Sequence, residues 1–158
     1  MNNKKTNEKI CTFFVSDYHF EMKSLPYISK SLEEDKNIVI LTENNLKGTI
    51  KTLIDRTNLN SKTKEKILEL NWENDDLNKF KIIKRNIEQE EDILIFIKGK
   101  LNYIKNINKN LEKWIKNTDS VKIVDCYDMS EVGQDIDEIM SNYKIVLNTS
   151  GEKEIEKL

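Results

Sequence analysis

Glycine is scarce in this sequence, and its scarcity excludes the common nucleotide-binding loops. Only four of the 158 residues are glycine, and each of them is isolated. The segment that follows the first apolar run, SDYHFEMKS at residues 16–24, contains none. The phosphate-binding loop GxxxxGK[ST] and the dinucleotide fingerprint GxGxxG both need glycines, because the backbone must approach phosphate groups closely. We therefore predict that the chain does not hydrolyse ATP, and we expect no cofactor.

Histidine and cysteine are also scarce, which leaves little for metal or nucleophilic chemistry. His19 is the only histidine, and the cysteines Cys11 and Cys126 lie far apart inside apolar runs, where cysteine is typically a small buried hydrophobe. Nothing marks the chain as secreted, so a disulfide is not expected. Ser16, Asp17 and His19 are too close in sequence to act as nucleophile, orienting acid and base. We expect no metal site and no enzyme activity.

Neither an excess of positive charge nor a long apolar segment is present. Lys and Arg number 26 against 28 Asp and Glu, a net charge of −2, whereas nucleic-acid binding needs a basic surplus on one face. The apolar runs are too short for a signal peptide or a membrane span. We expect a cytoplasmic protein that binds neither nucleic acid nor membranes. The sequence leaves open whether the chain forms a homo-oligomer.

Five short apolar runs predict the strands of one α/β domain. They are residues 10–15, 38–42, 92–97, 121–128 and 144–149. Residues 67–72 alternate apolar and polar side chains, which predicts a further strand at an edge of the sheet. Helical segments separate the runs, so the strands are expected to be mainly parallel, with helices on both faces. The predicted fold class is a RecA-like or Rossmann-like three-layer α/β sandwich.

The same pattern predicts the domain limits and several helix ends. Residues 1–9 are expected to form a flexible lead, 10–150 a single α/β domain, and 151–158 a charged C-terminal tail. Ser24 is expected to cap a helix that carries Pro26 in its first turn. Leu77 is expected on the buried stripe of a helix that opens at Asp75 or Asp76.

Polar side chains follow several of the predicted strands. In open α/β sheets, ligands sit outside the carboxyl ends of the strands. The predicted ligand-binding residues are therefore Asp17, His19, Glu43, Tyr127 and Asp128. Carboxylates supply acceptors, tyrosine offers a flat surface and a hydroxyl, and histidine changes charge near neutral pH. The alternative is structural: Ser16 and Asp17 cap a helix, and Asp125 and Asp128 bond backbone amides rather than hold Mg²⁺.

Three parts of the sequence resemble the MEDS domain, a sensory module named for methanogen and methylotroph signalling proteins. The segments CTFFVSD, YISKSLEEDKN and IVILTEN resemble its opening strand, helix and second strand, and NYIKNINKNLEKWI resembles its long helix before the fourth strand. The most specific part is VKIVDCYDMSEVGQDIDEIMSNYKIVL, in which Cys126, Tyr127 and Asp128 match a C-x-Y-D-like element. The resemblance implies a RecA-like fold without the phosphate-binding loop. It also implies signal sensing, often beside kinase or DNA-binding domains.

Three functions are compatible with these patterns. The first is a non-catalytic sensory or regulatory domain that binds an unknown small molecule and signals to a separate protein partner. The second is an adaptor that binds proteins through a degenerate RecA-like scaffold and has no ligand. The third is a small hydrolase or transferase that uses acidic residues at the strand ends. A pocket with perturbed acids there would favour the first or third function, and a closed, filled edge would favour the second.

Overall fold

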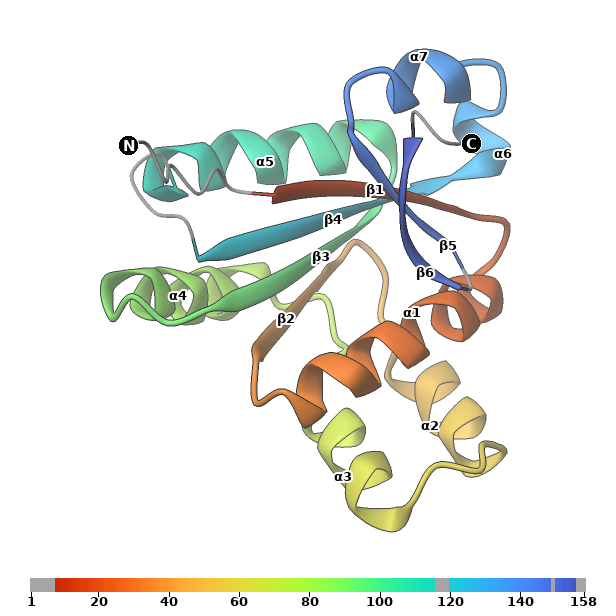
Figure 1. Cartoon of the computed structure of the whole chain (residues 1–158), viewed down its shortest axis with the longest axis vertical. Coiled ribbons are helices and arrows are strands. Elements are labelled where there is room, and N and C mark those ends of the chain that lie inside the picture. The colour runs from red at the N-terminus through yellow and green to blue at the C-terminus, as the bar shows by residue number, and fades with distance from the viewer. Residues whose placement is uncertain (1–7, 116–119, 149, 156–158) are drawn as a thin grey trace.

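A six-stranded sheet forms the centre of the protein (Figure 1). The computed structural model describes residues 8–115, 120–148 and 150–155. In sequence order the strands are β1 (Glu8–Phe14), β2 (Asn37–Thr42), β3 (Ile93–Gly99), β4 (Val121–Asp128), β5 (Ile145–Asn148) and β6 (Gly151–Glu154). Their spatial order is β2-β3-β4-β1-β5-β6; β1 to β5 are parallel, and β6 is antiparallel to β5. The predicted three-layer α/β class is confirmed.

Helices cover both faces of the sheet, because alternate residues of a strand point to opposite sides. Ile10 and Phe14 of β1 pack in one cluster with α1 (Asp17–Glu33), α2 (Lys47–Asp55) and α3 (Ser61–Glu69). Cys11 and Phe13 pack in a second cluster with α4 (Asp76–Glu88) and α5 (Leu101–Ile115). The short helices α6 (Met129–Val132) and α7 (Ile136–Met140) add to this second cluster. Figure 1 shows α1, α2 and α3 together on one side of the sheet.

The strand order creates a topological switch point between the neighbours β1 and β4. The chain leaves β1 towards α1 on one face, and it leaves β4 towards α6 and α7 on the other. In this protein β1 stands between β4 and β5, whereas in the dinucleotide-binding order it stands between β2 and β4. We call residues 15–19, 43–46, 98–101 and 128–131, at the ends of β1 to β4, the carboxyl edge. It is the place where sheets of this kind bind ligands.

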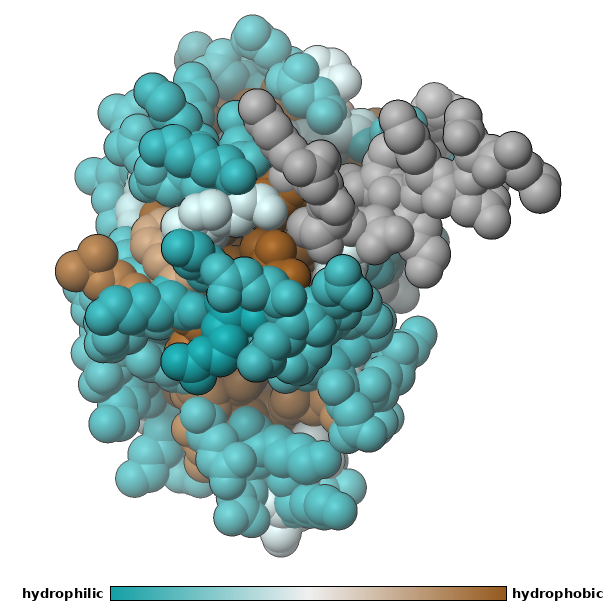
Figure 2. All heavy atoms as spheres, turned by 90° about the vertical axis from the view of Figure 1, so that its left-hand side faces the viewer, coloured by the Kyte–Doolittle hydropathy of each residue, from teal (hydrophilic) through white to brown (hydrophobic). Residues whose placement is uncertain are grey.

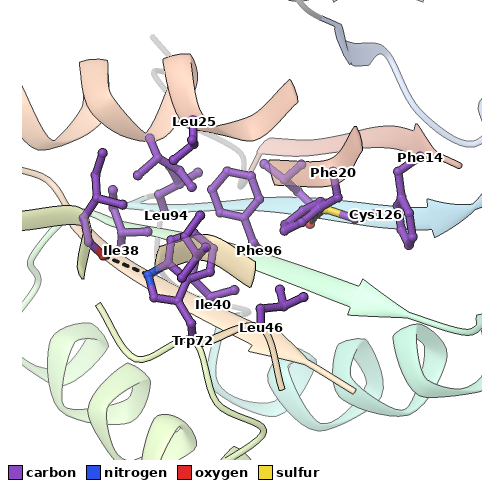
Figure 3. Packing of buried hydrophobic residues seen from close by; sticks show 14 of the residues in the cluster. Phe14, Phe20, Leu25, Ile38, Ile40, Leu46, Trp72, Leu94, Phe96 and Cys126 are labelled. Atoms are coloured by element: carbon purple, nitrogen blue, oxygen red, sulfur yellow. Dashed lines mark hydrogen bonds between the residues drawn. The ribbon is translucent and has the colours of Figure 1, made fainter. Parts of the chain in front are cut away.

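Aromatic side chains fill the core between α1 and the sheet (Figure 3). Phe20 of α1 packs edge to face against Phe14 of β1 and Phe96 of β3, with ring centroids 5.8 and 6.4 Å apart. Cys126 and Leu94 lie in the same cluster. Full burial of such side chains stabilises the fold by roughly 1.5–3 kcal/mol each. This packing fixes α1 against the strand ends.

The prediction of an edge strand at residues 67–72 is wrong. These residues contain the end of α3 and the extended segment after it. Ile67 is fully buried, while Leu68 is 40 % exposed and Glu69 is exposed as well, so only one side of the last turn of α3 faces the core. Trp72 turns back into the core (Figure 3). Its indole Nε1 donates to the carbonyl of Ile67 at 2.8 Å. The antiparallel edge strand is β6 instead.

Other expected boundaries also differ in the structure. Residues 151–154, expected in a charged tail, form β6, and Glu8 and Lys9, expected in a flexible lead, belong to β1. Residues 1–7 of that lead and 156–158 of that tail lie outside the described residues. Ser24 does not cap a helix: α1 is continuous from Asp17, and Ser16 caps it by accepting from the backbone N–H of His19. Pro26 lies inside the helix.

Helix α4 buries a lysine beside its apolar stripe. Ile83 of the expected stripe is buried, but Leu77 is 79 % exposed, and Lys79 is buried. The Lys79 ammonium donates to the backbone carbonyls of Ile40 and Glu73, so main-chain oxygens replace its water shell. Burial lowers the Lys79 pKa to about 8. The spacing of the apolar residues could not reveal that Lys79 is buried, because lysine is almost never fully buried.

The surface on the side where β1 begins is mainly hydrophilic, with small hydrophobic areas between the polar side chains (Figure 2). Among the residues that the structure describes, no helix is both long and apolar enough to cross a membrane.

Candidate functional site

A buried lysine connects three segments of the carboxyl edge. Lys98, at the end of β3, donates to Asp17 Oδ1 at 2.8 Å and to Asn44 Oδ1 at 3.0 Å. Asn44 closes the triangle by donating from Nδ2 to Asp17 Oδ2 at 2.9 Å. Asp17 begins α1 and Asn44 follows β2, so this network joins segments that are distant in the sequence. We call Lys98, Asp17 and Asn44 the edge network.

The two charges of the edge network have different exposure. The side chain of Lys98 is only 3 % exposed, while that of Asp17 is 38 % exposed. The Lys98 ammonium also lies 4.6 Å from the centre of the Phe14 ring and 5.5 Å from that of Phe20, where the ring faces attract a cation. A buried lysine without an anionic partner is costly. Lys98 therefore needs a nearby acceptor, and Asp17, the more exposed partner, supplies it.

Glu43, which follows β2, bonds the turn after β3. Its Oε1 accepts from the backbone N–H of Lys100 at 2.9 Å. Gly99 is required here, because a Cβ at this position would lie 2.7 Å from a Tyr103 ring carbon and 2.9 Å from Glu43 Oε1. The Tyr103 hydroxyl donates to Asp76 Oδ1 at 2.9 Å. Glu43 is thus committed to positioning the turn that leads into α5.

Glu21, one turn after Asp17 in α1, is a buried carboxyl group. It is 1 % exposed, and Thr49 Oγ1 of α2 lies 2.8 Å from its Oε2. Burial raises the Glu21 pKa to about 7, although the hydrogen bond from Thr49 acts in the opposite direction. The sequence offered one indication of this burial: Glu21 stands four residues before Leu25 and seven before Ile28, on the stripe that α1 buries.

His19 takes part in the N-terminal turn of α1. Its Nδ1 accepts from the backbone N–H of Val15 at 2.9 Å, which occupies the lone pair that a ligand or a proton would use. Burial, followed by the charge of Lys23, lowers the His19 pKa. His19 therefore stays neutral near pH 7. Its role is structural, because it accepts the backbone N–H that directly follows β1.

Tyr127 and Asp128 are separate from the edge network. Tyr127 is 6 % exposed and lies in the cluster beneath α5, where its hydroxyl is 2.6 Å from that of Tyr143. Tyr143 donates to the buried Asp125, which also accepts from Asn108 at 2.9 Å. Burial raises the Asp125 pKa. Asp128 caps α6 by accepting from the backbone N–H of Ser130 at 2.9 Å.

The structure thus brings together only part of the predicted site. Asp17 and Glu43 lie at one edge with Lys98 and Asn44, whereas His19, Tyr127 and Asp128 bond to their own surroundings. Among the described residues there is no group of three or more His, Cys, Asp or Glu side chains that could hold a metal ion.

Comparisons with known proteins give no assignment. No match to the chain was found among family models, curated proteins or solved structures.

Proposed function

We propose that this chain is a non-catalytic sensory or regulatory domain that binds a small molecule at the carboxyl edge and signals to a separate protein partner. The observation that carries the proposal is the edge network. It ties α1, the segment before α2 and the end of β3 through one half-exposed carboxylate. The resemblance of residues 126–128 to the MEDS domain supports a sensory role.

The physical basis is an exchange of partners on Lys98. A ligand with a carboxylate or another strong acceptor replaces Asp17 at the Lys98 ammonium, so the buried charge stays paired in both states. Asp17 is then released from Lys98 and Asn44, and α1 loses one of its connections to α2 and β3. A partner protein that contacts α1 then binds the two states of this helix with different affinity. A ligand that favours one of two such states shifts their populations by its differential affinity.

A thermal-shift screen of small carboxylates, amino acids and amides tests the proposal. A ligand at about 100 times its Kd stabilises the native state by about 2.7 kcal/mol, which raises the melting temperature by roughly 5–10 °C in a domain of this size. The shift should disappear in Lys98→Met and remain in Lys100→Met, which removes a neighbouring exposed lysine. A shift that survives Lys98→Met would place the ligand elsewhere.

The second candidate is the adaptor without a ligand. It is favoured by the closed state of the edge, where Asp17, Asn44 and Lys98 satisfy one another and Glu43 bonds the backbone. A screen in which no compound changes the melting temperature of the wild type would support the adaptor and contradict the sensor.

A further inference from the structure

A pocket of about 430 Å³ lies between α1 and the β5–β6 hairpin, apart from the edge network. Its polar lining comes from Lys23, Tyr27 and Lys30 of α1 and from Asn148, Ser150 and Glu152 of the hairpin. Its volume is within the range of small-molecule sites, roughly 300–1,000 Å³. The same helix that carries Asp17 at its start forms one wall of this pocket.

The pocket has a surplus of positive charge. Lys23 and Lys30 are its cations, and neither takes part in a salt bridge within residues 8–115, 120–148 and 150–155. Lys23 donates to the carbonyl of Phe13 at 2.8 Å, which is a neutral acceptor. Burial lowers the Lys23 pKa, because a neutral carbonyl compensates only in part for the water that the ammonium loses. An anion in the pocket would supply that compensation.

The one acid of the pocket does not cancel this charge. Glu152 accepts from the Tyr27 hydroxyl at 2.5 Å and pairs with Lys122 at 3.0 Å. Burial favours protonation of Glu152, but these two partners outweigh it and lower its pKa. The carboxylate is therefore ionised. Lys122, which lies outside the pocket lining, pairs with it and also with Glu8 at 3.2 Å, so Glu152 leaves one of the two lysine charges of the pocket uncompensated.

The hairpin adds neutral donors. Asn148 uses Oδ1 to accept from the backbone N–H of Ser150 at 2.8 Å, which leaves its Nδ2 group as a donor. Ser150 belongs to the same lining, and a serine hydroxyl can donate as well. Two ammonium groups and two neutral donors match an anion with several acceptor oxygens.

We propose that this pocket binds a small organic phosphate, whose dianionic group pairs with Lys23 and Lys30. A phosphate monoester carries close to two negative charges at neutral pH and three acceptor oxygens, which balances the two lysines. Lysine acts as a point charge and does not need the planar geometry that a carboxylate offers to arginine. The volume leaves room for an organic part beside the Tyr27 ring.

Titration of the ¹⁵N-labelled protein with glycerol 3-phosphate tests this site, with glycerol as the uncharged control. Saturable shifts are expected at the amides of residues 23–25, 27–30 and 150–152. The double variant Lys23→Gln/Lys30→Gln should weaken binding by about a hundredfold, because each charged hydrogen bond contributes roughly a factor of ten. The matched variant Lys105→Gln/Lys109→Gln removes two exposed lysines of α5 and should bind as the wild type does.

Three outcomes would overturn the proposal. The first is a wild type without saturable shifts, and the second is binding that the exposed single variant Lys30→Gln leaves unchanged. Lys30 is exposed, so its substitution does not endanger the fold. The third is a set of shifts centred on Asp17, Asn44 and Lys98, which would assign the phosphate to the edge network and leave the proposed regulatory function intact.

Discussion

Replacing Glu21 with Gln should stabilise the protein at alkaline pH and change its stability little at mildly acidic pH. The reason lies in the hydrogen bonds between α1 and α2. Thr49 Oγ1 lies 2.8 Å from Glu21 Oε2 and 3.1 Å from the carbonyl of Leu46. A hydroxyl has one proton and cannot donate to both. A protonated Glu21 resolves this by donating to Thr49, which then donates to Leu46, and Gln at position 21 can donate in the same way.

The magnitude follows from the pKa of Glu21, which burial raises from 4.5 to about 7. Because the native pKa is above the unfolded one, the native state binds more protons between these values. The resulting stability is fully present below pH 4.5 and is lost as the pH rises through about 7. At about 1.4 kcal/mol per pKa unit, the loss reaches about 3 kcal/mol at most. Gln does not ionise, so the variant avoids this loss.

Urea unfolding at several values from about pH 5 to about pH 8.5 measures the effect. The fluorescence of the buried Trp72 and the partly buried Trp114 reports on the transition. The free energy of unfolding of Glu21→Gln minus that of the wild type should increase with pH, from near zero to about 3 kcal/mol. Glu33→Gln, an exposed change in the same helix, is the matched control and should show no trend. A difference that is constant across this range would refute the reasoning.

Three further predictions concern the edge network, the core and the surface. A double-mutant cycle of Asp17→Asn and Lys98→Met, measured by urea unfolding, should give a coupling energy of about 1–2 kcal/mol. This is less than for a fully buried pair, because Asp17 is 38 % exposed. A coupling energy of zero would contradict the ion pair. Ile95→Ala should lower the free energy of unfolding by about 2–5 kcal/mol, because Ile95 is fully buried in β3; a loss below about 1 kcal/mol would contradict its packing. Leu77→Ser should change it by less than about 0.5 kcal/mol, because Leu77 is 79 % exposed; a larger loss would show that α4 buries this residue.

The strands of this fold could be predicted from the sequence because parallel strands are buried on both faces and form continuous apolar runs. The runs at 38–42 and 121–128 correspond closely to β2 and β4. The edges of the sheet could not be predicted in the same way. The exposed strand β6 has the sequence GEKE, which contains no apolar residue. Residues 67–72 alternate apolar and polar side chains as an edge strand does, but they form the last residues of α3 and the extended segment after it.

The candidate site could be predicted in position but not in its contacts. The rule for strand ends correctly brought Asp17 and Glu43 to one edge. It could not say which face each side chain of β4 would take, because apolar residues occupy both faces of that strand. Asp125 and Tyr127 share one face, where Tyr143 joins them in a buried network. Lys98 could not be predicted as the centre of the site, since nothing in the sequence indicates that its ammonium is buried.

Helix α1 is the element that both proposed sites share. Asp17 and Glu21 face the edge network and α2, whereas Lys23, Tyr27 and Lys30 face the β5–β6 hairpin. At 3.6 residues per turn, these two sets form separate stripes on the same helix. A ligand that binds at one stripe and displaces α1 therefore changes the contacts that the other stripe makes. Because coupling between two binding sites is reciprocal, we expect a phosphate beside Lys23 and an acceptor at Lys98 to alter each other's affinity by the same factor.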